Sequence, residues 1–66
     1  MIKTKIGTNA GRIWRFLSQN GESSIVEIRN ALSMKASDVS LALGWLARED
    51  KIHFFEDEDG IRVTLE

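Results

Sequence analysis

The chain has 66 residues, with 9 lysines and arginines against 10 aspartates and glutamates, and it contains no cysteine and no proline. A chain of this length forms one domain at most and buries only about 60% of the surface that its unfolded form exposes, so its core is small. The lack of cysteine excludes a disulfide framework and a thiolate metal site. The net charge of -1 gives no overall attraction to phosphate, unlike most domains that bind nucleic acids. We therefore expect a single domain over residues 1–66 that is stabilised by packing, including packing across a dimer interface.

The chain has no apolar run of about 18 residues, and its first ten residues, MIKTKIGTNA, lack the apolar stretch of a signal peptide. A membrane-spanning helix and a secretory leader are thus not indicated. We expect a cytoplasmic protein with no membrane partner.

A first helix is predicted to begin near Thr8 or Asn9, because either side chain can cap a helix, and to end before Gly21. Five residues at helical spacing form the face that we expect to meet the core: Ala10, Ile13, Phe16, Leu17 and Asn20.

Two further helices are predicted after Gly21. Ser24, followed three residues later by Glu27, is a capping box that starts a short second helix. Its inward residues are expected to be Ile25, Ile28, Ala31 and Leu32. The stretch LSMKAS is typical of a tight turn, and a third helix follows over about residues 36–50. The inward residues of the third helix are expected to be Val39, Ala42, Leu43 and Leu46.

After residue 51 the apolar period changes from 3.6 to 2, which predicts two strands around residues 52–55 and 61–65. The segment EDEDG between them is expected to be the hairpin loop, with glycine supplying a positive φ. A short strand around residues 22–24 can complete the sheet. The order of elements predicts an α+β fold, a winged helix-turn-helix in which a three-helix core is followed by a C-terminal β-hairpin wing.

The stretch LALGWLAREDKI, residues 41–52, places Gly44 beside Trp45 inside the third helix. With Val39 at the centre of the buried face, Leu41, Gly44 and Arg48 point nearly the opposite way, and Trp45 lies on the flank. A glycine inside a helix is about 1 kcal/mol less favourable than alanine. We expect that another backbone or a large ring approaches Gly44 closely.

The first helix repeats this arrangement, with Gly11 on its outer face and Trp14 on its flank. One interpretation is that both tryptophans cover the edges of a small core and the glycines make room for them. The other is that these residues form an apolar patch covered by a partner protein, and a second copy of the chain is the simplest such partner. The predicted protein interface consists of Gly11, Trp14, Leu41, Gly44 and Trp45.

DNA binding is the alternative function, because the second helix of a helix-turn-helix motif commonly lies in the major groove. The residues that would contact DNA are Lys35, Ser37, Ser40 and Arg48, of which only two are basic. The EDED segment adds four carboxylates to the wing, within about one Debye length (8 Å) of where phosphates would lie. The acidic wing thus disfavours nucleic acid as a partner. A solvated hairpin tip that prevents edge aggregation is the simpler interpretation of these acids.

Catalysis is not indicated, since the chain has one histidine, no cysteine and no glycine-rich loop that would bind phosphate. His53 is expected to be an outward-facing strand residue. The paired carboxylates of the wing have no apolar pocket that would raise a pKa. We therefore predict no catalytic, cofactor-binding or metal-binding residues and no small-molecule substrate.

The stretches NAGRIW, residues 9–14, and LALGWLAREDKI resemble a small prokaryotic family of winged helix-turn-helix domains of uncharacterised function. The resemblance covers essentially the whole chain. It implies the winged-helix fold and a shared structural pattern that includes Gly11, Trp14, Gly44 and Trp45. It implies no ligand or activity, and the chain departs from the DNA-binding majority of winged helices in the few basic residues of its third helix and wing.

Overall fold

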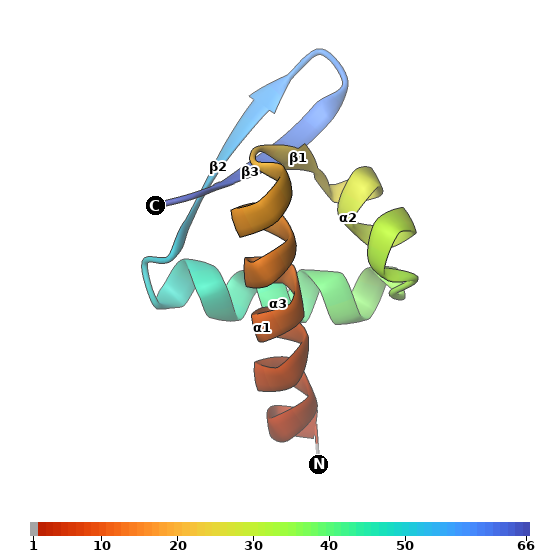
Figure 1. The fold of residues 1–66 in the computed structure, drawn as a ribbon, viewed down its shortest axis with the longest axis vertical. Coiled ribbons are helices and arrows are strands. Elements are labelled where there is room, and N and C mark those ends of the chain that lie inside the picture. The colour runs from red at the N-terminus through yellow and green to blue at the C-terminus, as the bar shows by residue number, and fades with distance from the viewer. Residues whose placement is uncertain (1) are drawn as a thin grey trace.

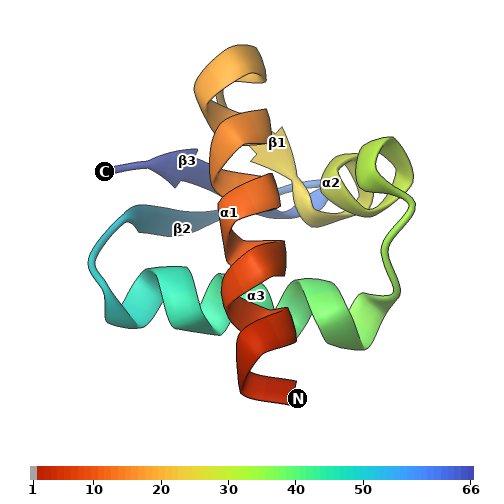
Figure 2. The same ribbon diagram turned by 60° about the horizontal axis from the view of Figure 1, so that its bottom comes forward.

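The computed structural model describes residues 2–66. The elements in chain order are α1 (Ile2–Asn20), β1 (Ser23–Ser24), α2 (Ile25–Leu32), α3 (Ala36–Arg48), β2 (Ile52–Asp57) and β3 (Gly60–Leu65). Helix α1 crosses over α3, and the β2–β3 hairpin extends away from the helices as a wing (Figures 1 and 2). The predicted winged helix-turn-helix fold, three helices followed by a hairpin, is confirmed.

One core joins all three helices to the sheet. Its buried apolar side chains are Ala10, Ile13, Leu17, Ile28, Met34, Val39, Ala42, Leu43, Leu46, Ile52 and Val63. All four inward residues predicted for α3 are among them. On α1 the predicted face is correct for three residues, whereas Phe16 is half-buried and Asn20 is exposed, with its side-chain amide donating to the Phe16 carbonyl at 2.9 Å. On α2 only Ile28 is fully buried, and Ala31 is exposed, contrary to the prediction.

The start predicted for the first helix at Thr8 or Asn9 is wrong, since α1 is already helical at Ile2. Asn9 lies within the helical segment and does not cap it, and the residue is only 8% exposed. Most of the first two turns are exposed, so they show little of the apolar pattern that marks a buried helix. An ion pair between Lys5 Nζ and Asp38 Oδ2, at 3.5 Å, links this extension of α1 to α3.

The helix boundaries after α1 follow the predicted local signals. The N–H of Gly21, at φ 75°, donates to the Leu17 carbonyl at 2.8 Å and ends α1. The Ser24 hydroxyl accepts the Glu27 N–H at 3.0 Å, and the Glu27 carboxylate accepts the Ser24 N–H at 2.9 Å, so the predicted capping box is present. Helix α3 ends two residues earlier than predicted, and Asp50 follows it in the left-handed region at φ 56°.

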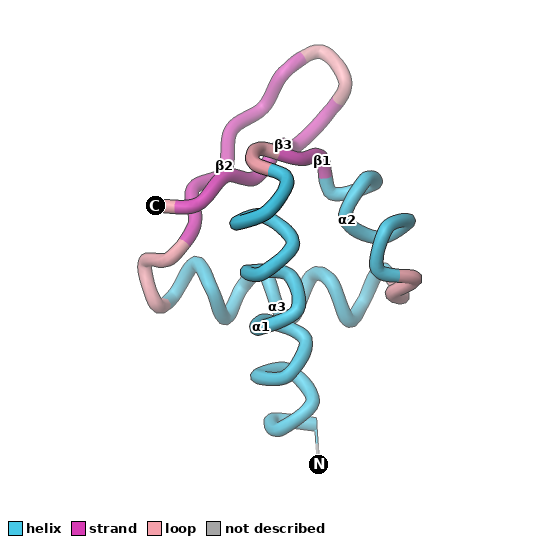
Figure 3. Tube along the Cα trace, viewed as in Figure 1, coloured by secondary structure: helices cyan, strands magenta, loops and turns pink. Residues whose placement is uncertain are grey.

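The three strands form an antiparallel sheet in the order β1-β3-β2. The predicted short strand is present as β1, which pairs with β3. The wing loop is shorter than the predicted EDEDG segment, because the ladder continues to the pair Asp57 and Gly60 and leaves only Glu58 and Asp59 in the turn (Figure 3). The Asp57 carboxylate accepts the Asp59 N–H at 2.8 Å and stabilises this tight turn.

Candidate functional site

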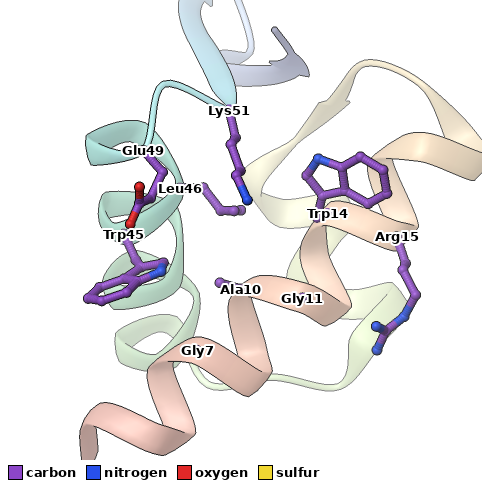
Figure 4. A pocket seen from close by; sticks show the side chains of 9 residues that line it. All are labelled: Gly7, Ala10, Gly11, Trp14, Arg15, Trp45, Leu46, Glu49 and Lys51. Atoms are coloured by element: carbon purple, nitrogen blue, oxygen red, sulfur yellow. The ribbon is translucent and has the colours of Figure 1, made fainter.

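A groove of about 670 Å³ lies between α1 and the C-terminal half of α3, and we call it the α1–α3 groove (Figure 4). Its lining residues come from α1, from α3 and from the segment between α3 and β2, and they are Gly7, Ala10, Gly11, Trp14, Arg15, Trp45, Leu46, Glu49 and Lys51. The groove thus forms where α1 and α3 cross, from segments that are far apart in the sequence.

Two tryptophans from different helices flank the α1–α3 groove. Trp14 on α1 is 41% exposed, whereas Trp45 on α3 is half-buried and packs against the core. Their indoles lie on opposite sides of the groove, with the small residues of α1 between them (Figure 4). Such a pair offers large apolar surfaces at an accessible site, as is typical of protein interfaces.

The glycines of this region are not required by the packing of the chain. A Cβ atom at Gly7 or Gly44 would meet no atom within 4 Å beyond the immediate neighbours, and one at Gly11 would meet only Arg15 Nη1, at 3.7 Å. Within residues 2–66, no other element approaches Gly44 in this way, so the expected close approach of a backbone or ring is not made inside the described chain. The interpretation that the glycines make room for indoles elsewhere in the fold fails for the same reason. Their small size leaves open surface on α1 and on the outer face of α3.

Charges of both signs line the α1–α3 groove. Arg15 lies at one end and Glu49 at the other, while the side chain of Lys51 reaches toward the groove from the segment after α3 (Figure 4). Within residues 2–66, none of these three groups forms an ion pair shorter than 4.0 Å. They are thus available to charges on another molecule.

The structure brings together three of the five predicted interface residues, since Gly11, Trp14 and Trp45 all line the groove. Leu41, which is 50% exposed, and Gly44 lie on the exposed side of α3 but do not line it.

Six residues that line the groove are not in the interface predicted from the sequence: Gly7, Ala10, Arg15, Leu46, Glu49 and Lys51. Gly7 could have been found, because it precedes Gly11 by four residues and such residues share a helix face. Glu49 and Lys51 come to the groove only through the crossing of the two helices.

The four predicted DNA contacts, Lys35, Ser37, Ser40 and Arg48, are all exposed. They extend from the residue before α3 to its last turn, so about 20 Å of helix separates the two basic groups. Asp38 lies among them and is paired with Lys5. This face therefore carries little positive charge.

Arg62 on β3 joins the acidic residues at the base of the wing. Its Nε lies 2.7 Å from Glu22 and 3.7 Å from Asp57, and its Nη1 lies 3.6 Å from Glu27. The hydrogen bond to Glu22, with the nearby carboxylates, raises the pKa of Arg62 above its ordinary value. Three wing carboxylates, on Glu56, Glu58 and Asp59, have no such cation within 4.0 Å in the described chain.

The described part of the chain shows no cluster of three or more side chains that could hold a metal ion. His53 is exposed on β2 and its Nε2 lies 2.9 Å from a carboxylate oxygen of Glu66. No helix within residues 2–66 has both the length and the apolar character needed to cross a membrane.

Residues 1–65 match the model of the family described as winged helix-turn-helix domain (DUF2582). The chain belongs to this family. An uncharacterised protein of Methanocaldococcus jannaschii, MJ1608, is 42% identical over 57 residues, which cover 82% of this chain and 80% of the relative. The solution NMR structure of BT2368 from Bacteroides thetaiotaomicron superposes with a TM-score of 0.89 at 33% identity, covering all of this chain and 80% of that one.

These relatives confirm the resemblance to an uncharacterised winged helix-turn-helix family. The descriptions of the family and of these two relatives name no ligand. The function must therefore be argued from the groove and the surfaces of this chain.

Proposed function

We propose that this DUF2582 domain is a non-enzymatic binding module that acts through protein contact and forms a symmetric dimer. Its interface is the α1–α3 groove together with the adjacent outer face of α3, where Leu41 and Gly44 are exposed. The observation that carries the proposal is a surface with three helical glycines beside two tryptophans, where the fold of one chain gives no packing reason for the glycines.

The glycines are a measurable disadvantage to the monomer. Each of Gly7, Gly11 and Gly44 makes its helix about 1 kcal/mol less stable than alanine would. Small domains have a total free energy of unfolding on the order of 5–15 kcal/mol, and this core is small. Close approach of a partner backbone supplies a compensating contact that a side chain at these positions would prevent.

The charges of the α1–α3 groove favour a second copy as the partner. In a two-fold dimer every contact occurs twice. If one residue of the first subunit contacts a different residue of the second, the same two residues are also in contact with the subunits exchanged. Arg15 or Lys51 of one subunit can therefore meet Glu49 of the other, twice per dimer. The surface is self-complementary in charge as well as apolar in its walls.

The proposal of a non-enzymatic role rests on the side chains of the groove. They include no histidine, serine or threonine beside a base, and the single carboxylate, Glu49, is exposed. Nucleophilic catalysis needs a nucleophile within hydrogen-bond reach of a base, and the groove offers only binding groups.

Sedimentation equilibrium over a wide concentration range tests the dimer, with Trp14→Ala as the main variant. Trp14 suits this test better than Trp45, because Trp45 packs against the core and its truncation also weakens the fold. Phe55→Ala is the matched control, since Phe55 is 40% exposed against 41% for Trp14 but does not line the groove.

We expect the wild-type chain to dimerise and Trp14→Ala to weaken the dimer by at least tenfold, as is common for an aromatic residue at an interface centre. Phe55→Ala should change the dimer dissociation constant by less than about twofold. A strictly monomeric wild-type chain, or equal effects of the two variants, would contradict the proposal.

DNA binding by the outer face of α3 is the alternative, supported by the exposure of all four candidate residues, Lys35, Ser37, Ser40 and Arg48. It predicts an affinity for duplex DNA that falls steeply with salt and with Lys35→Ala or Arg48→Ala. Absence of binding at low ionic strength in a fluorescence anisotropy titration would eliminate this alternative.

A further inference from the structure

The outer edge of β2 has no partner strand. The sheet order β1-β3-β2 places β2 at the edge. Within residues 2–66, no backbone group outside the ladder bonds to Ile52–Asp57. The edge therefore presents a row of unpaired backbone donors and acceptors.

The ladder fixes which groups point outward. The Glu66 N–H donates to the Lys51 carbonyl at 2.9 Å, so this pair is hydrogen-bonded. Bonded and non-bonded pairs alternate along an antiparallel ladder. Residues 53, 55 and 57 thus bond to β3, while the N–H and C=O groups of Ile52, Phe54 and Glu56 face the open edge. These spacings match what an added strand requires.

The centre of this edge lacks the features that usually block strand addition. Six one-to-one pairs run from Ile52 to Asp57 without a bulge, and the segment IHFFED has no proline and no lysine. Phe54 and Phe55, on opposite faces of β2, are 45% and 40% exposed. The middle of the edge is therefore free of bulges and apolar on both faces.

A second hollow, of about 460 Å³, lies beside the edge. Its walls are mainly apolar and are formed by Ile25, Phe54, Phe55, Glu56 and Ile61. It shares no residue with the α1–α3 groove. An apolar side chain of an added strand can enter this hollow while its backbone bonds to β2.

The negative charge near the outer edge of β2 determines which kind of strand can pair with it. The wing tip carries Glu56, Glu58 and Asp59 without a nearby cation in the described chain. Two β2 strands bring like charge to the pairing, because each carries Glu56 and Asp57 and no lysine or arginine within Ile52–Asp57. Like charges opposite each other destabilise strand pairing. The edge thus disfavours another copy of this chain and favours a strand that carries basic residues.

We infer that the outer edge of β2 binds an extended segment of a partner protein in which apolar and basic residues alternate. The backbone of that segment pairs with Ile52, Phe54 and Glu56, and an apolar residue enters the hollow beside Phe54. Because successive side chains of a strand point to opposite faces, the alternating lysines or arginines lie on the face of Phe55, where they meet the carboxylates of the wing turn, Glu58 and Asp59. This site goes beyond the proposed dimer, since it involves a different surface and a different partner.

Hydrogen exchange of the 66-residue chain by NMR tests the inference. The probe is a synthetic octapeptide of alternating valine and lysine, and the control peptide has glutamate in place of each lysine. We expect the lysine peptide to slow exchange of the outward-facing Phe54 and Glu56 amides by at least tenfold at saturation. The glutamate peptide should leave both rates unchanged.

Two variants separate charge recognition at the edge from the general charge of the chain. Glu58→Gln, in the wing turn, should weaken the lysine peptide by about two- to fivefold, the range for an exposed charge pair. Asp50→Asn is the matched control, because it also removes one negative charge and asparagine tolerates the left-handed backbone there. It should change the affinity by less than about 1.5-fold.

Several results overturn the inference. These are no change in the amide spectrum at millimolar lysine peptide, equal binding of both peptides, or shifts confined to the α1–α3 groove. Equal effects of Glu58→Gln and Asp50→Asn also overturn it, because they show only nonspecific attraction. Loss of the dimer in sedimentation experiments has no bearing on this site, so failure of the proposed function is distinguishable from failure of the edge site.

Discussion

Replacing Gly44 by alanine separates the stability of the chain from its association. A Cβ atom at this exposed position of α3 would meet no atom within 4 Å beyond its neighbours. The helix preference for alanine over glycine therefore applies without a steric penalty, and the free energy of unfolding of the monomer should rise by about 0.8–1.0 kcal/mol. For a domain of this size, that corresponds to an increase in Tm of about 4–8 °C.

Urea denaturation followed by tryptophan fluorescence measures this effect at a protein concentration below the dimer dissociation constant, where the monomer predominates. Sedimentation equilibrium on the same variant should show a weaker dimer, because the new methyl group prevents close approach of a partner backbone. Gly60→Ala is the control of opposite sign: Gly60 has φ +119°, so alanine there should destabilise the wing.

Two outcomes would refute this reasoning. If Gly44→Ala lowers the free energy of unfolding of the monomer, the outer face of α3 contacts something within the fold. If it raises that free energy and leaves the dimer dissociation constant unchanged, a partner does not explain the glycine, and the interface does not include this part of α3.

Three further predictions concern the fold. Ser24→Ala removes one half of the capping box and should reduce the free energy of unfolding by about 1 kcal/mol, measured by urea denaturation. Hydrogen bonds from the backbone and side chain of Ser24 lower the pKa of Glu27 below its ordinary value of 4.5. The carboxylate therefore contributes stability above the unfolded-state pKa, and this contribution is lost as pH falls through the lower folded-state pKa. Urea midpoints measured across this acidic range should fall less in Glu27→Gln than in wild type. Ile28→Val, at a fully buried site, should cost about 0.5–1.5 kcal/mol without changing association in sedimentation equilibrium.

Local signals made much of the fold predictable. The capping box at Ser24, the turn at Gly21 and the inward face of α3 each depend on residues within one or two helical turns, and each is present in the structure. The start of α1 was missed because Thr8 and Asn9 resemble caps. Ile6, at the spacing of Ala10 and Ile13, continues the same face into the first turns and is the signal that could have corrected it.

The candidate site was predictable only in part. The paired glycine and tryptophan of each helix indicated Gly11, Trp14 and Trp45, which do meet in one groove. Glu49 and Lys51 reach the groove because α3 crosses α1 and the chain then turns at Asp50. No spacing within a single helix encodes that crossing. The sequence alone therefore does not predict that charged groups from different elements meet in the groove.

Ser24 serves two elements at once. It is the last residue of β1, paired with Arg62 of β3, and it is also the N-cap of α2. Fraying of the short strand therefore removes the helix cap, and melting of the helix start releases the strand. Strand β1 and helix α2 should therefore open as one cooperative unit, so α2 should not unfold while β1 stays paired with β3.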